Sequence, residues 1–173
     1  MTKRFATVLM LASATTLAAC AKKAPEELPP PPPSATDSGP ATPTAATPSG
    51  PQVGSQAHFE DAVNGQNVIF FDTDRFNIDS ADAAALQTQA QYLARYPQVR
   101  ITVEGHADER GTREYNLALG ERRANAAKNY LVSLGVDASR VATVSYGKER
   151  PVALASNAQA WAQNRRAVSV VIN

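Results

Sequence analysis

The segment that decides the fold reads EGHADERGTREYN over residues 104–116. It follows an alternation of apolar and polar residues over 99–103, which indicates a strand with one covered face. It then turns through two glycines into a long helical pattern over 114–134, which Gly135 closes. The segment therefore predicts a polar loop that leads from the end of a strand to a helix N-terminus, where unpaired backbone N–H groups suit a carboxylate ligand.

Strands and helices alternate along the rest of the folded region. The apolar patterns predict strands over 68–71, 142–146 and 168–172, and helices over 80–96 and 158–163. Ser80 is expected to cap the first of these helices, and Tyr130 and Trp161 are interpreted as core residues. This order predicts an α/β sandwich, in which a mixed sheet of about four strands is covered by helices. At least one crossover is expected to join parallel strands.

Residues 1–19 are predicted to be a secretory signal, because Lys3 and Arg4 precede an apolar stretch and small residues. The sequence Leu-Ala-Ala-Cys, ending at Cys20, resembles the lipobox of bacterial lipoproteins. That resemblance implies that the Cys20 thiol is lipidated and that Cys20 becomes the first mature residue. A plain signal peptide with an incidental cysteine is the alternative. A transmembrane helix is disfavoured, because the apolar run is shorter than the roughly 20 residues that span a bilayer. Ala21 favours the outer membrane by analogy, since inner-membrane retention signals often have aspartate there.

A disordered, proline-rich linker is predicted over residues 20–56, after which residues 57–173 form one domain. Ten of the twelve prolines lie between positions 24 and 52, where no apolar periodicity is present and no core can form. In the polyproline II conformation this stretch reaches roughly 90 Å when fully extended. The linker therefore predicts a spacer that holds the domain away from a membrane anchor.

The charge balance argues against two classes of partner. Loss of Lys3 and Arg4 with the signal leaves 15 basic and 16 acidic residues. Such a balance gives no reason to expect a nucleic acid or an anionic membrane surface as partner. Cys20 is the only cysteine, so no intrachain disulfide can form. We expect no cofactor and no metal.

The long helix carries a charged residue on its apolar stripe. The stripe starts at Leu119, and Arg123 follows four residues later on the same face or at its edge. A guanidinium beside a core needs a carboxylate partner or a ligand. Asp108 in the preceding loop is the natural counter-charge, and Asn116 shares the face. Spacing alone leaves two alternatives open: Arg122 could point inward instead, or the Asp–Arg pair could only clamp the loop to the helix.

An enzyme is the alternative suggested by Glu104, His106 and Asp108, which are spaced by two and could share one face of a strand. This spacing is compatible with a metal site or a hydrolase. The signal is weak, because the chain has only two histidines and no nucleophile motif. We expect His106 to be a structural residue with a hydrogen bond near the strand end, and we predict no enzymatic activity.

Several motifs together resemble the OmpA-like domain family. They read, in chain order, FFDTD over 70–74, VEGHADERGT over 103–112, EYN over 114–116, LGERRAN over 119–125, VSYGK over 144–148 and NRRAV over 164–168. The resemblance covers nearly all of residues 68–172, and within the family it is strongest to the peptidoglycan-associated lipoproteins. Arg113 departs from the pattern, since proline is expected there.

The resemblance implies that the domain binds the meso-diaminopimelate stem peptide of peptidoglycan. By position, Asp108 receives the ammonium of the ligand and Arg123, rather than Arg122, receives its carboxylate. The family pattern also places the remaining site residues, with Thr112, Asn116 and Leu119 lining the pocket and Asp72 and Asp74 completing its rim. Without a ligand, Asp108 and Arg123 are expected to lie close together, each as a substitute partner for the other.

The resemblance also implies a location and protein partners. A lipid anchor at Cys20 implies the periplasmic face of the outer membrane, which the domain would tether to the cell wall. Members of this kind belong to the Tol system of envelope maintenance and cell division, and they bind TolB through a surface that overlaps the wall site. A protein that acts mainly as a docking module for other proteins is the alternative.

Overall fold

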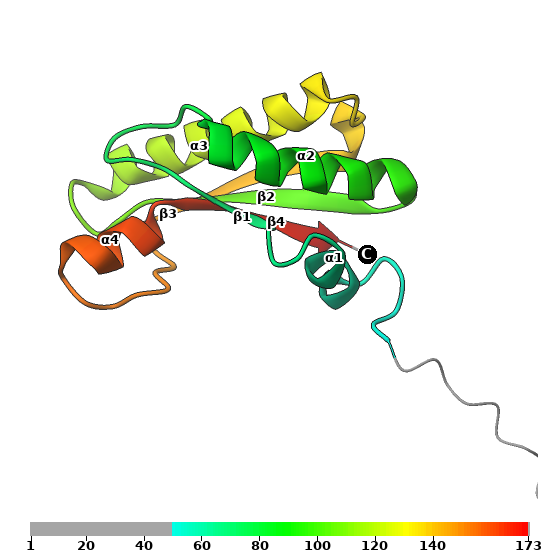
Figure 1. Cartoon of the computed structure of the whole chain (residues 1–173). Coiled ribbons are helices and arrows are strands. Elements are labelled where there is room, and N and C mark those ends of the chain that lie inside the picture. Colours follow the sequence, from blue (N-terminus) through cyan, green and yellow to red (C-terminus); the bar gives the residue numbers. More distant parts are fainter. Residues whose placement is uncertain (1–49, 173) are drawn as a thin grey trace, which may run out of the picture. The chain divides into compact units, whose positions relative to one another are not determined.

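The computed structural model describes residues 50–172 (Figure 1). Their elements are, in chain order, α1 (Gln56–Ala62), β1 (Val68–Phe70), α2 (Ser80–Arg95), β2 (Arg100–His106), α3 (Arg113–Ser133), the 3₁₀ helix η1 (Ala138–Arg140), β3 (Val141–Gly147), α4 (Ala158–Asn164) and β4 (Arg166–Ile172). The predicted signal, Cys20 and the linker up to residue 49 lie outside the described residues. Within residues 50–172, no helix is both long enough and apolar enough to cross a membrane.

The four strands form one mixed sheet in the order β1-β4-β2-β3. Strand β4 pairs antiparallel with both β1 and β2, and β2 pairs parallel with β3. Helix α3 connects the parallel pair, which is the crossover that the sequence predicts. The predicted α/β class with a mixed four-stranded sheet is therefore confirmed.

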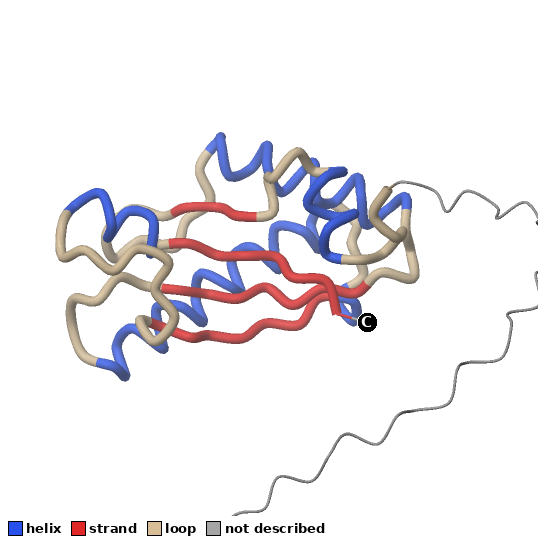
Figure 2. The backbone as a smooth tube through the Cα atoms, turned by 90° about the horizontal axis from the view of Figure 1, so that it is seen from below, coloured by secondary structure: helices blue, strands red, loops and turns tan. Residues whose placement is uncertain are grey.

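The helices α2 and α3 lie side by side on one face of the sheet (Figure 1). Figure 2 views the opposite face, where the strands run without a covering helix over most of their length. The core fills the space between the two layers, and its most enclosed residues include Leu93 of α2, Ile101 of β2 and Leu131 of α3, none of which is exposed. Burial of each such side chain contributes about 1.5–3 kcal/mol. The layer pair is therefore the main source of stability.

The apolar residues that predict the last strand face away from the helices. In β4, Ala167 and Ser169 are buried against α2 and α3, whereas Val168 and Val170 are only half buried on the open face. Ser169 donates a hydrogen bond from Oγ to Gln89 Oε1 of α2 at 2.7 Å. Alternation thus identifies the strand correctly, but the covered face carries small residues because helices lie close to it.

The start of α2 differs from the prediction by one residue. Asp79, not Ser80, is the N-cap, with extended backbone and a side-chain oxygen that accepts from Asp82 N at 2.8 Å. Both residues are common N-caps, so the local sequence allowed either choice. The carboxylate cap also places charge at a cavity, because Asp79 and Asp82 both line one.

Helix α1 was not predicted, and the folded region begins before the expected residue 57. Ser55 caps this helix by accepting from His58 N at 3.2 Å, and Phe59 and Val63 are completely buried. A helix of seven residues gives only two apolar positions on one face. That is too short for periodicity to separate a helix from the end of a linker.

Candidate functional site

A cavity of about 550 Å³ opens at the end of the sheet where β2 stops and α3 begins, and we call it the Asp108 pocket. Four segments line it: Thr73 and Asp74 after β1, residues 107, 108 and 110–112 after β2, Tyr115, Asn116, Leu119 and Arg123 on α3, and Arg165 before β4. These segments meet because the carboxyl ends of β1 and β2 and the start of β4 lie at one edge of the sheet.

The loop over 107–112 is held in place from α3. Gly111 has a φ of +84°, in the left-handed region that glycine adopts readily. Thr112 is the N-cap of α3, with Oγ1 accepting from Tyr115 N at 3.2 Å. The buried Asn116 donates from Nδ2 to the carbonyl oxygens of Arg110 and Thr112 at 2.7 and 3.1 Å. Asn116, predicted as a pocket residue, therefore also fixes the loop that carries Asp108.

Arg123 is completely buried and borders the pocket from α3. Its Nε, Nη1 and Nη2 atoms donate to the carbonyl oxygens of Arg75, His106 and Asp72 at 2.9, 2.8 and 3.0 Å. Within the described residues, no carboxylate forms an ion pair with it. Burial and the nearby charge of Arg165 lower its pKa to about 10. A guanidinium has five N–H groups, so these three contacts leave one N–H unused on each terminal nitrogen.

Asp108 is paired with two other arginines. Arg110 donates to both carboxylate oxygens, from Nη2 at 2.6 Å and from Nε at 3.0 Å, and Arg165 Nη1 lies 3.5 Å from Oδ2. Burial alone would raise the pKa of Asp108, but the hydrogen bonds and charge of Arg110, with help from Arg165, outweigh it and lower the pKa. The Arg110 side chain is 42% exposed and lies over the Trp161 ring at 4.3 Å. Asp108 is thus covered by an arginine that has access to solvent.

The predicted pairing of Asp108 with Arg123 is wrong. The carboxylate oxygens of Asp108 accept from Arg110 and Arg165, whereas Arg123 donates three hydrogen bonds to backbone carbonyls. Both residues nevertheless border the same cavity, and Arg123 rather than Arg122 is the inward one. The simple clamp between Asp108 and Arg123, which spacing had left open, is excluded by the same contacts.

The structure places six of the seven predicted ligand residues in the Asp108 pocket. They are Asp74, Asp108, Thr112, Asn116, Leu119 and Arg123. The side chain of Asp72 lines a neighbouring cavity instead, and only its carbonyl takes part here, by accepting from Arg123. Asp74 has a φ of +57° and accepts from the Tyr115 hydroxyl at 2.9 Å, which fixes the rim of the pocket.

Sequence reasoning missed Arg110, Tyr115 and Arg165 as pocket residues, and it placed Trp161 wrongly. Trp161 is not a core residue: its ring lies under Arg110, and its Nε1 donates to Glu109 Oε1 at 2.8 Å. Only the contact between Arg110 and Asp108 could have been predicted from the sequence, because Arg110 follows Asp108 by two residues in a tight loop. Arg165 reaches Asp108 across 57 residues of chain, and no local pattern marks that contact. Tyr130 does pack against the core, as predicted.

His106 lies beside the Asp108 pocket but does not line it. The residue is 1% exposed, and neither ring nitrogen has a hydrogen-bond partner, so the expected hydrogen bond is absent. Its Nε2 lies 3.7 Å from Glu104 Oε2, while Asp108 faces its arginines. Among residues 50–172, no three His, Cys, Asp or Glu side chains are grouped so that they could hold a metal ion.

Acid is expected to destabilise the fold through His106. Burial, followed by the charges of Arg166 and Arg150, lowers its pKa from 6.5 to about 4. The folded state therefore favours the neutral ring, and this stabilisation is complete above pH 6.5 and is lost as the pH falls toward 4. Between pH 7 and pH 4 we expect His106 alone to lower the free energy of unfolding by about 3 kcal/mol.

Denaturant unfolding at pH 7, 5.5 and 4 measures this effect. The variant His106→Gln should show a shallower loss of stability with acid than the unchanged protein. The matched control is His58→Gln, which removes the other histidine of the chain. Unlike the ring of His106, the ring of His58 has a hydrogen-bond partner, since its Nδ1 lies 2.9 Å from the Tyr92 hydroxyl. The same pH dependence in His106→Gln and in the unchanged protein would contradict the assignment.

Comparisons with known proteins agree on one family for this chain. The sequence model of the OmpA family matches residues 70–165. A peptidoglycan-associated lipoprotein of Agrobacterium fabrum is 59% identical over 118 residues, which are 68% of this chain and 66% of the relative. One from Brucella melitensis is 55% identical over 118 residues, covering 68% of this chain and 69% of the relative. The match thus spans about two thirds of the length of these relatives.

Solved structures agree with this result. The crystal structure of the peptidoglycan-associated lipoprotein from Burkholderia pseudomallei has a TM-score of 0.63 and 44% sequence identity. The aligned region covers 65% of this chain and 96% of the chain in the crystal structure. The relatives are binding and structural proteins, so the chain is not an enzyme and the catalytic interpretation of Glu104, His106 and Asp108 is set aside. The chain belongs to the OmpA family, and within that family it is similar to the peptidoglycan-associated lipoproteins.

Proposed function

We propose that the Asp108 pocket binds the meso-diaminopimelate stem peptide of peptidoglycan without forming a covalent bond. The observation that carries the proposal is Arg123, a fully buried guanidinium that borders the cavity and has no carboxylate partner in the described part of the chain. A buried charge of this kind is costly unless it is paired. A ligand carboxylate would supply the pair, and the names of the relatives point to peptidoglycan as its source.

The side chain of diaminopimelate ends in an ammonium and a carboxylate on one carbon, and the pocket offers a group for each. The ligand carboxylate accepts from the two unused N–H groups of Arg123 in a forked geometry, which arginine provides and lysine does not. The ligand ammonium donates to Asp108 and displaces Arg110, whose exposed side chain can turn to solvent. Arg110 thus occupies the ammonium position in the empty pocket.

The first test is the variant Asp108→Asn, titrated with a muropeptide that contains diaminopimelate. The substitution keeps the shape of the side chain but removes the charge that receives the ammonium. We expect the affinity to fall by about 2 kcal/mol, or roughly thirtyfold. Isothermal titration calorimetry on the purified protein measures this change, and circular dichroism confirms that the variant is folded.

The matched control is Glu109→Gln, which removes the neighbouring exposed charge outside the pocket. Its affinity should stay within about twofold of the unchanged protein. A second control replaces diaminopimelate in the ligand by lysine, which lacks the carboxylate assigned to Arg123. Equal binding of both peptides, or an unchanged affinity of Asp108→Asn, would remove the basis of the proposal.

We further propose that this pocket tethers the outer membrane to the wall through a lipid on Cys20. The support is the lipobox resemblance of residues 17–20, the proline-rich spacer after it and the naming of the relatives as lipoproteins. Stable anchoring needs more than one acyl chain, which a lipidated N-terminal cysteine carries. The deciding measurement is membrane fractionation of Cys20→Ser: recovery of this variant with the outer membrane would overturn the anchor.

Docking of TolB or another Tol protein is the second candidate function, and one surface favours it. Val152 and Leu154 are 61% and 85% exposed on the loop between β3 and α4. The buried Asn164 fixes the backbone of that loop by accepting from Val152 N and Ala153 N at 2.8 and 3.1 Å. A rigid loop with exposed apolar side chains suits a protein partner. Unchanged TolB binding by Leu154→Ser would contradict docking on this loop. Simultaneous binding of TolB and muropeptide without mutual weakening would contradict the overlap with the wall site that the family resemblance implies.

A further inference from the structure

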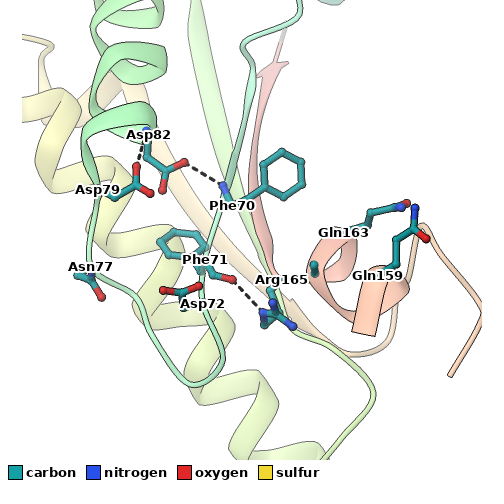
Figure 3. A pocket seen from close by; sticks show the side chains of 10 residues that line it. Phe70, Phe71, Asp72, Asn77, Asp79, Asp82, Gln159, Gln163 and Arg165 are labelled. Atoms are coloured by element: carbon teal, nitrogen blue, oxygen red, sulfur yellow. Dashed lines mark hydrogen bonds between the residues drawn. The ribbon is translucent and has the colours of Figure 1, made fainter. Parts of the chain in front are cut away.

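A second cavity, of about 410 Å³, adjoins the Asp108 pocket, and we call it the Phe70 cavity. Figure 3 shows it between the segment that follows β1 and helix α4. Its lining residues are mainly aromatic, amide and carboxylate groups, represented by Phe70, Asp72, Gln159 and Gln163. Its volume falls within the range of sites that bind small ligands. The function proposed above does not use it.

The two cavities share a wall and one residue. Arg165 lines both, with Nε donating to Phe71 O at 2.9 Å and Nη1 lying 3.5 Å from Asp108 Oδ2. The turn after β1 separates them, because Asp72 lines the Phe70 cavity while Thr73 and Asp74 line the Asp108 pocket. A ligand that occupies both cavities would have to pass Arg165, the residue that lines both of them.

The polar groups of the Phe70 cavity are arranged for a neutral ligand with many hydroxyls. Two of its carboxylates already hold the start of α2, since Asp79 accepts from Asp82 N at 2.8 Å and Asp82 accepts from Phe70 N at 3.0 Å (Figure 3). The helix dipole at this end offsets their charge. Asp72 remains as an exposed acceptor opposite Arg165, and the carboxamides of α4 both donate and accept.

The aromatic ring adds a flat apolar surface to this polar rim. Phe70 is 51% exposed, although a phenyl ring of this size is usually buried. The excess of carboxylates over the single arginine disfavours an anionic group in the cavity. An exposed ring flanked by carboxamides and a carboxylate is complementary to a sugar, whose C–H face packs on the ring while its hydroxyls bond at the edge.

We infer that the Phe70 cavity is a subsite for an N-acetylated, and therefore neutral, amino sugar of the glycan strand. The inference rests on the proposed function, because the stem peptide is covalently attached to that strand. Occupation of the Asp108 pocket by the peptide raises the local concentration of the sugar at the second cavity, so a weak contact there strengthens binding. The two cavities together recognise a glycopeptide, and neither needs to bind the free sugar tightly.

The test compares two probes on the purified protein. One is the diaminopimelate-containing tripeptide, and the other is the same tripeptide attached to its disaccharide. The unchanged protein is expected to bind the glycopeptide roughly tenfold more tightly than the tripeptide. Phe70→Ala should remove this difference and leave the affinity for the tripeptide unchanged. Gln163→Ala, an exposed substitution on α4, should reduce the difference in the same way.

The matched control is Phe76→Ala, because Phe76 is a similarly exposed ring at 46% that does not line the cavity. It should keep the full difference between the probes. Equal affinity of the unchanged protein for both probes would overturn the sugar subsite, as would a Phe70→Ala variant that keeps the difference or loses affinity for both probes alike. Failure of the unchanged protein to bind the tripeptide at all would instead overturn the proposed function, so the two failures are distinguishable.

Discussion

Replacement of Arg123 by alanine is expected to lower the free energy of unfolding by at least about 3 kcal/mol and to abolish muropeptide binding. The loss of stability follows from the three backbone carbonyls that Arg123 satisfies, at Asp72, Arg75 and His106. Two of these carbonyls lie in the turn after β1 and the third at the end of β2, so one side chain ties these two segments together. Removal also leaves a void beside the ring of Phe71, over which the guanidinium lies at 5.1 Å.

Urea denaturation and calorimetric titration measure the two effects separately. Arg122→Ala is the matched control, because it removes the same charge from the neighbouring, exposed position of α3. That variant should lose less than about 0.5 kcal/mol of stability and should bind normally. Arg123→Lys keeps a positive charge but cannot fork onto a carboxylate, so we expect a folded protein with weakened binding. Normal binding by Arg123→Lys would show that the fork is not needed.

Replacement of Gly105 by alanine is expected to cost more than about 4 kcal/mol of stability, a large part of the roughly 5–15 kcal/mol that holds a typical domain folded. Gly105 on β2 faces Gly120 on α3, and a methyl group on Gly105 would overlap the carbonyl carbon and oxygen of Gly120. The obstacle is backbone rather than a movable side chain. Helix α3 would have to lift from the sheet, and the Asp108 pocket between them would change shape.

Thermal and urea unfolding of Gly105→Ala measure this effect. Gly65→Ala is the control that separates crowding from backbone conformation. Gly65 has a φ of +72°, but a methyl group added to it would meet no atom of another part of the chain within 4 Å, so its substitution should cost only about 1 kcal/mol. A Gly105→Ala protein that is as stable as Gly65→Ala would mean that α3 can move away from the sheet at little cost.

These two expectations share one structural basis. The Asp108 pocket lies beside the close contact between Gly105 of β2 and Gly120 of α3, and Arg123, one turn further along α3, is completely buried. Because Arg123 supports the fold, loss of ligand binding in an Arg123 variant would not by itself show that Arg123 contacts the ligand. Measurements of affinity are therefore informative only for variants whose folded fraction is known.

The sequence alone determined the order of elements and most of the pocket. Apolar patterns located α2, α3, α4 and all four strands to within a few residues, because such segments bury one face wherever they lie, whereas the short α1 was missed. The polar loop over 104–116 identified the site, since a strand end, a capped helix start and a glycine at positive φ are all local features. With the family resemblance, the residues Asp108, Asn116 and Arg123 were placed in one pocket correctly.

Only the tertiary structure decided which charges meet. Arg110 and Arg165 hold the buried carboxylate of Asp108, whereas Arg123 in the same pocket donates to backbone carbonyls. These contacts depend on how the turn after β1, the loop after β2 and the start of β4 come together. The position of Asp72, which lines the Phe70 cavity rather than the Asp108 pocket, likewise depends on the path of the turn after β1. Hydrogen bonds and ion pairs act over a few ångströms and depend on direction, whereas residue spacing fixes position only within one element. The contact of Arg110 with Asp108 lies within one loop, but the contacts of Arg123 and Arg165 depend on the packing of distant segments, which no local pattern in the chain encodes.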